Sequence, residues 1–139
     1  MSEVDFTVRW SSPVPYEGKY SKAIPNHDGV YEILVKRKGS SDSNRRYVGQ
    51  GNLSDRYLAH LGKDEPNECI KDKVANYAVY FRYHVDEIPA EDDRVDLEMT
   101  LFKRWKHQCN DPRQIRDSGR NYSIRLKEIA SDEHPKIPS

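Results

Sequence analysis

The sequence predicts an α+β fold: a small three-stranded antiparallel β-sheet flanked by helices, with an irregular N-terminal arm. Two observations support this fold class. Short segments rich in β-branched and aromatic residues, which favour strands, recur along the chain. Other segments carry apolar residues at helical spacing. A chain of 139 residues fits one domain, with its elements in the order β-β-α-α-β-α.

The composition limits the class of protein. The chain is 35% hydrophobic and 33% charged, with a mean hydropathy of -0.98, so its core must be small. No apolar run approaches the roughly 20 residues that a membrane span needs. The N-terminus lacks the basic start and apolar stretch of a secretory signal. Two cysteines alone are too few for a disulfide scaffold or a thiolate zinc site. We therefore expect a cytoplasmic protein with no membrane partner.

The chain divides into three parts by composition. Residues 1–28 are interrupted by prolines and are expected to form an arm packed on the domain, with one short strand at Phe6–Trp10. Residues 29–130 form the domain itself. The polar residues 131–139 are expected to be a flexible tail.

Three strands are expected in the domain. Residues Gly29–Lys36 and Arg45–Gly49 are strand-like, and the Gly/Ser/Asp-rich residues 37–44 between them predict a β-hairpin with a long loop. Residues Ala78–Val85 alternate in polarity and predict the third strand.

The expected helices follow from spacing and capping. Ser54 is placed to cap a helix that ends at Gly62. A weaker helix is expected over Glu68–Ala75 and the strongest over Glu91–His107. An amphipathic segment around Tyr122–Ile129 follows, with no element type assigned.

Two helices carry candidate functional residues. Arg56 and His60 are four residues apart and share one helix face, where Arg suits a phosphate and His moves protons near neutral pH. The alternative is an ordinary solvated helix face. Glu98 falls within or beside the apolar stripe of the long helix, and a carboxylate there is costly to bury unpaired. Its alternative is a boundary residue that pairs with Arg94 or Arg104.

Tyrosines on the first two strands are further candidates. Tyr31 and Tyr47 lie on strands that pair, so their rings can approach each other. Gly29 and Gly49 let the backbone run close to a neighbour. Taken singly, each tyrosine is more often a half-buried packing residue.

The charges are balanced in number but segregated along the chain. Lys and Arg total 23, and so do Asp and Glu. Basic residues gather over 36–56 and 103–125 and acidic ones over 86–96. This pattern fits a basic groove with an acidic back or metal-side wall, and ordinary surface patchiness is the alternative.

Taken in order, these residues resemble the GIY-YIG nuclease superfamily. Residues 29–31 (Gly-Val-Tyr) resemble its first signature triplet and residues 47–49 (Tyr-Val-Gly) its second, with Val in place of Ile in both. Arg56 and His60 then fall where the family's helix carries its Arg and, in many members, its His. The chain looks like a small stand-alone protein of this kind.

The resemblance extends to residue 110. Glu98 is similar to the family's metal-binding Glu, and Asn110 to its closing Asn, although Asn121 competes for that position. The hairpin between the two triplets is longer than in compact members of the family.

The resemblance implies a metal-dependent endonuclease, a hydrolase of phosphodiester bonds. One Mg²⁺ or Mn²⁺ ion would be held by Glu98, Arg56 would orient the phosphate, and Asn110 would be an orienting residue. Tyr31 or His60 would take the proton of the attacking water, with Tyr47 in the same cluster, and the order of proton transfer stays open.

The resemblance favours DNA as the substrate and leaves RNA open. Candidate backbone contacts are basic residues of the hairpin and the last helix: Lys36, Lys38, Arg45, Arg46, Lys103 and Lys106. Action as a homodimer or beside a partner chain is equally open. The alternative function is a catalytically silent nucleic-acid-binding or partner-binding module on the same fold, which would need none of the candidate catalytic residues together.

Overall fold

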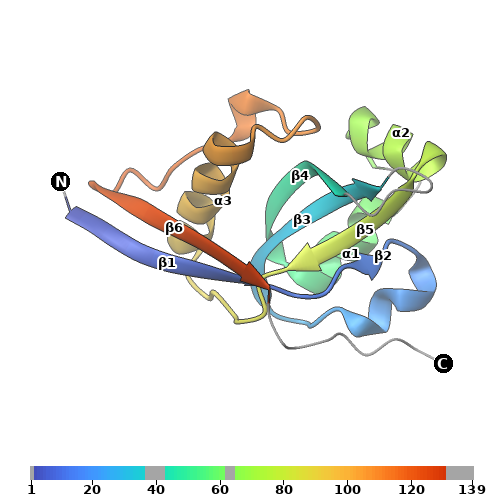
Figure 1. The fold of residues 1–139 in the computed structure, drawn as a ribbon, viewed down its shortest axis with the longest axis horizontal. Helices are drawn as coiled ribbons and strands as arrows, with labels where there is room; N and C mark the ends of the chain where they lie inside the picture. The colour runs from blue at the N-terminus through green and yellow to red at the C-terminus, as the bar shows by residue number, and fades with distance from the viewer. Residues whose placement is uncertain (1, 37–42, 62–64, 131–139) are drawn as a thin grey trace.

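A computed structural model of the chain describes residues 2–36, 43–61 and 65–130 (Figure 1). The strands are β1 (Ser2–Trp10), β2 (Val14–Pro15), β3 (Asp28–Lys36), β4 (Ser43–Asn52), β5 (Ala78–Tyr83) and β6 (Tyr122–Ala130). The helices are α1 (Leu53–Leu61), α2 (Glu68–Asn76) and α3 (Glu91–Trp105), with short 3-10 turns η1 (Gly18–Ala23) and η2 (Pro112–Gln114). In this part of the chain no helix has the length and apolar character needed to cross a membrane.

The central sheet is antiparallel, with strand order β2-β5-β3-β4. The predicted α+β class is confirmed, and the sheet has four strands rather than three. The fourth strand, β2, is only two residues long and pairs Val14 with Phe81. A two-residue strand that follows Pro13 and includes Pro15 has no periodicity of its own, which is why the sequence shows no sign of it.

The sheet is covered on both faces. Ile33 and Phe81 pack on one face with residues of α1 and α2, such as Leu53 and Ile70. On the other face, Val30 and Val48 pack with Val8 of β1 and with Leu97 and Leu101 of α3. Because β3 is buried on both faces, successive side chains along this strand enter two different cores.

The N-terminal arm is more regular than the sequence predicts. The strand expected at Phe6–Trp10 begins at Ser2, and β1 pairs in parallel with β6 along its whole length. Figure 1 shows these two strands running side by side away from the central sheet, with α3 beside them. The two strands lie at opposite ends of the chain, so no local pattern announces their pairing. The amphipathic segment around Tyr122–Ile129 is therefore a strand, β6.

Glu32 is a fully buried carboxylate on the β1 and α3 side of the sheet. It accepts a hydrogen bond from Arg82 Nε at 2.9 Å and pairs with His107 Nε2 at 2.7 Å. Arg45 approaches it at 3.5 Å. A buried charge requires such partners, so Glu32 links β3 to β5, to β4 and to the segment that follows α3.

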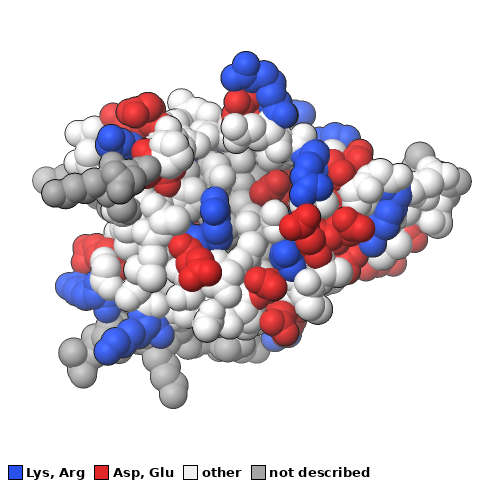
Figure 2. Space-filling view, turned by 180° about the vertical axis from the view of Figure 1, so that it is seen from behind, with Lys and Arg blue, Asp and Glu red and all other residues white. Residues whose placement is uncertain are grey.

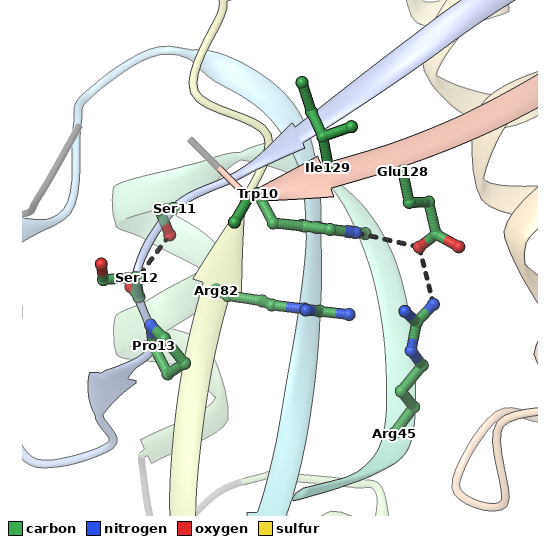
Figure 3. A pocket seen from close by; sticks show the side chains of 9 residues that line it. Trp10, Ser11, Ser12, Pro13, Arg45, Arg82, Glu128 and Ile129 are labelled. Carbon is green, nitrogen blue, oxygen red and sulfur yellow. Dashed lines mark hydrogen bonds and ion pairs between the residues drawn. The ribbon is translucent and has the colours of Figure 1, made fainter. Parts of the chain in front are cut away.

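Near this cluster a cavity of about 330 Å³ opens beside the ends of β1 and β6 (Figure 3). Trp10 lies between Glu128, which accepts its Nε1–H at 2.9 Å, and the guanidinium of Arg82, 4.4 Å from its ring centroid. Glu128 also pairs with Arg45 at 2.6 Å. These contacts join the β1–β6 pair to the central sheet.

The two cysteines, too few for a scaffold, form one disulfide between Cys69 on α2 and Cys109 after α3. Asn67, the N-cap of α2, reinforces this link because its side chain donates to the Cys109 carbonyl at 2.8 Å. The expected boundaries of the tail at 131–139 and most of the long hairpin loop lie outside the described residues.

Reduction of the Cys69–Cys109 disulfide is expected to lower the free energy of unfolding by about 2–4 kcal/mol. The bond closes a loop with a sequence separation of 40, and a cross-link of this length reduces the entropy of the unfolded chain. Urea unfolding with and without dithiothreitol measures the effect. The Cys69→Ser/Cys109→Ser protein serves as the control and should not respond to the reductant. Two free thiols in the denatured, unreduced protein would contradict the pairing.

Candidate active site

Tyr31 stands at the centre of the candidate site. Its side chain is fully buried on β3, with its ring stacked on Phe81 at a centroid distance of 4.8 Å. The ring lies directly across Gly49, its partner residue on β4. A Cβ atom at residue 49 would overlap the Tyr31 hydroxyl, so only glycine leaves room for the ring. Gly49 of the second triplet is therefore required by the position of Tyr31 in the first.

The structure brings both predicted helix residues to Tyr31. Its hydroxyl lies 2.8 Å from His60 Nε2, and Arg56 Nε donates to the same oxygen at 3.5 Å. The helix that carries them begins at Leu53, and Asn52 Oδ1 accepts the Asp55 N–H at 3.0 Å. The N-terminal turn is thus held by Asn52 rather than by Ser54 as expected.

Tyr47 joins the same cluster from β4. Its ring centroid lies 6.1 Å from that of Tyr31 and 5.1 Å from that of His60, which it meets edge-on. Burial raises the pKa of Tyr31 well above its ordinary value and also raises the pKa of Tyr47. Both phenols are therefore protonated near neutral pH and act as hydrogen-bond donors.

Glu98 supplies a carboxylate to the cluster from α3. Burial raises its pKa to about 7, while Arg116 and Arg56 oppose the rise. Its negative charge in turn raises the pKa of Tyr31 and Tyr47. Neither arginine considered as a partner from the sequence reaches it: Arg94 binds Gln50 and backbone carbonyls, and Arg104 approaches Glu128.

The surroundings of Glu98 fit a divalent cation. No hydrogen-bond donor to its carboxylate is found among the residues that the structure describes, and the carboxylate binds a proton more tightly than usual. A cation can replace that proton and satisfy the partly buried charge. Over the same ranges, no three His, Cys, Asp or Glu residues gather as a metal cage. A cation at Glu98 would therefore take its other ligands from water or substrate, as Mg²⁺ commonly does.

Glu65 also belongs to the cluster, although nothing in the sequence marks it as a candidate. Its buried carboxylate pairs with His60 Nδ1, and its other oxygen accepts the Asn67 N–H at 2.9 Å. Burial lowers the pKa of His60, and Glu65 opposes that effect. Glu65 lies in the connection between α1 and α2 and so shares no helix face with His60; no periodic signal links the two.

Asn110 lies beside the site but binds backbone. Its Oδ1 accepts the Val48 N–H and its Nδ2 donates to the Val48 carbonyl, both at 2.8 Å. It thus holds β4 between Tyr47 and Gly49. The competing candidate, Asn121, lines a separate hollow between α3 and β6.

Two of the basic residues expected at a nucleic-acid surface have partners within the chain. Arg45 is engaged by Glu32 and Glu128 and packs over Trp105 at 3.9 Å, while Arg46 donates to Gln108 at 2.5 Å. The other candidates are a partly buried β3 residue, two residues of the α3 end and one residue outside the described ranges: Lys36, Lys103, Lys106 and Lys38. On the face shown in Figure 2, basic and acidic side chains are interspersed rather than gathered in one basic groove.

Comparisons with known proteins show similarity in fold. No family model and no curated protein sequence matches the chain. Two solved structures do: point mutants of the GIY-YIG N-terminal endonuclease domain of UvrC from Thermotoga maritima, each bound to its catalytic divalent cation. The first is 20% identical with a TM-score of 0.44 and covers 67% of this chain and 92% of that domain. The second is 19% identical with a TM-score of 0.43 and covers 66% and 90%.

These likenesses concern the fold alone. What the chain can do chemically depends on its own side chains.

Gly49→Ala is expected to destabilise the protein by about 1–3 kcal/mol, because the added methyl group overlaps the buried Tyr31 ring. Gly18→Ala is the matched control, since a Cβ at residue 18 meets nothing within 4 Å. Both changes restrict the unfolded chain alike. Urea unfolding of the two variants measures the difference, and equal stability would contradict the close approach of Tyr31.

As the pH rises from about 4.5 to about 7, the ionisation of Glu98 is expected to lower the free energy of unfolding of the metal-free protein. Burial raises the folded-state pKa of Glu98 to about 7 from an ordinary 4.5, so the folded protein binds this proton more tightly. The contribution is fully present below the unfolded pKa and is lost as the pH passes the folded one. Melting temperatures in EDTA should fall less steeply over this range in Glu98→Gln than in the wild type. If the melting temperatures of the wild type and Glu98→Gln fall equally steeply with pH, the raised pKa of Glu98 is excluded.

Proposed function

We propose that the protein is a metal-dependent endonuclease that hydrolyses phosphodiester bonds in DNA. The observation that carries the proposal is the convergence of a hydrogen-bonded Tyr31–His60 pair with Arg56 and the partly buried Glu98 carboxylate. A proton acceptor, an anion-binding fork and a ligand for a cation are the groups that phosphodiester hydrolysis requires.

Tyr31 and His60 transfer the proton of the attacking water. Because Tyr31 is protonated and donates to His60 Nε2, its hydroxyl oxygen is the site that receives a proton from water. As that proton arrives, Tyr31 passes its own to His60. The neutral imidazole is therefore the final acceptor, and the phenol relays the proton without ionising beforehand.

Arg56 binds and orients the phosphate. Its guanidinium remains charged, since its pKa is raised next to Tyr31. Nε contacts the Tyr31 hydroxyl, which leaves the two terminal nitrogens for a non-bridging oxygen. The phosphate is thereby held next to the oxygen that takes the proton.

Glu98 holds one Mg²⁺ or Mn²⁺ ion. When bound, the cation supplies positive charge that stabilises the leaving oxygen and the phosphate in the transition state. Asn110 contributes indirectly, because it fixes the β4 backbone that positions Tyr47 and Gly49. The UvrC domain to which the chain is similar in fold is an endonuclease domain bound to a catalytic divalent cation, which accords with a cation in the proposed reaction.

Glu98→Gln is expected to reduce cleavage of supercoiled plasmid in Mg²⁺ or Mn²⁺ by about 10²-fold or more. The reason is that a bound cation contributes several kcal/mol to such a reaction. Asp92→Asn is the matched control: it removes an exposed carboxylate from the same helix and should cut within about twofold of the wild type. Nicking and linearisation are followed on agarose gels, with EDTA as a second control.

Equal cleavage by the wild type and Glu98→Gln would exclude Glu98 as the metal ligand. If no form cleaves but the plasmid is retarded on the gel, the protein is a binding module and the nuclease proposal is wrong.

A further inference from the structure

We infer that Glu65 is a positioning residue for the proposed reaction: it holds His60 in the tautomer and orientation that accept the Tyr31 proton. The catalytic role of Glu65 rests on the proposed function. The pairing itself rests only on the geometry of three buried side chains.

The hydrogen bonds define where each proton lies. The Glu65 carboxylate can only accept, so His60 Nδ1, which it contacts, must carry a hydrogen. In the neutral ring this leaves Nε2 as an acceptor, and Nε2 faces the Tyr31 hydroxyl at 2.8 Å. The opposite tautomer would place a donor on Nε2 and leave Nδ1 without a hydrogen for the carboxylate. Glu65 therefore selects the tautomer that the relay needs.

Glu65 is itself rigidly held. Its side chain is buried, and its second oxygen accepts the Asn67 N–H. Asn67 caps α2 and donates to the Cys109 carbonyl. The Cys69–Cys109 disulfide ties the first turn of α2 to the same segment after α3. The carboxylate is thus held by a segment that is anchored to α2 and to Cys109, which favours a precise hydrogen bond over a mobile ion pair.

The charges around His60 determine how much the ring depends on the Glu65 carboxylate to become positively charged. His60 faces the Tyr31 ring from β3, the Tyr47 ring from β4, Arg56 on its own helix and Glu65 from the α1–α2 connection. Burial and Arg56 both oppose a positive charge on the ring, and among these groups the Glu65 carboxylate favours it. Once His60 has taken the proton, Glu65 stabilises the imidazolium.

The experiment compares the wild type with Glu65→Gln and with Glu68→Gln, the matched control. Glu68 is exposed three residues further along the chain, so its substitution removes the same charge from the same segment without touching His60. The His60 ring is followed by ¹⁵N NMR over a pH titration of the metal-free protein, and plasmid cleavage is measured over the same pH range.

Four results are expected. In the wild type, neutral His60 carries its hydrogen on Nδ1. In Glu65→Gln the His60 titration moves to lower pH, whereas in Glu68→Gln it does not. The cleavage rate of Glu65→Gln falls between about 10-fold and 10³-fold with KM unchanged, since general-base catalysis as a whole contributes about 10²–10⁴. The acidic limb of its pH profile moves to lower pH with the His60 titration.

The proposal is overturned if wild-type His60 carries its hydrogen on Nε2, a result that needs no variant to fold. It is also overturned if Glu65→Gln leaves the His60 titration in place, or shifts it while cleaving at the wild-type rate. A protein that cleaves no DNA but shows the shift retains the pairing and loses the nuclease proposal, so the two failures are distinguishable.

Discussion

The contact on which the site depends is the passage of the Tyr31 ring across Gly49. With a side chain at residue 49, the ring would have to turn away from Phe81, and its hydroxyl would leave the reach of His60. The register between β3 and β4 places the two residues opposite each other. Since α1 follows β4 directly, the same register also sets where Arg56 and His60 meet the phenol.

That register is maintained from the opposite face of β3. Neighbouring residues of a strand point to opposite faces of the sheet. Glu32 therefore lies on the face covered by β1 and α3, while Tyr31 lies on the face covered by α1 and α2. Its partners come from β5, from β4 and from the segment after α3. Removing one partner of a buried ion cluster is far more costly than replacing the whole cluster, because the remaining charge is left uncompensated. The cluster therefore resists any slip of β3 that would move Tyr31 relative to Gly49.

Much of the core of this arrangement could be predicted from sequence because its signals are local. The two triplets, the four-residue spacing of Arg56 and His60 and the position of Glu98 within an apolar stripe are each visible in a short window. The pairing of β1 with β6 and of Cys69 with Cys109 is not, because it joins distant segments. Arg45 illustrates a further limit: a basic residue in a polar hairpin suggests a surface contact, but only the fold shows that two carboxylates and a tryptophan engage it. The disulfide also bears on the expected cytoplasmic location, which stays a prediction, since such bonds are uncommon in reducing compartments.

The electrostatics of the cluster couple the two ligands of the proposed reaction. Burial resists ionisation of Glu98 and of both tyrosines, and Glu98 adds to that resistance at each phenol. A phosphodiester bound to Arg56 would bring a further negative charge next to Glu98 and would favour the protonated carboxyl. A divalent cation at Glu98 reverses this balance, because it replaces the proton and attracts the phosphate. Substrate and cation should therefore each raise the affinity of the site for the other. The partly buried Glu98 carboxylate, whose ionisation is unfavourable in the free protein, is what makes their binding interdependent.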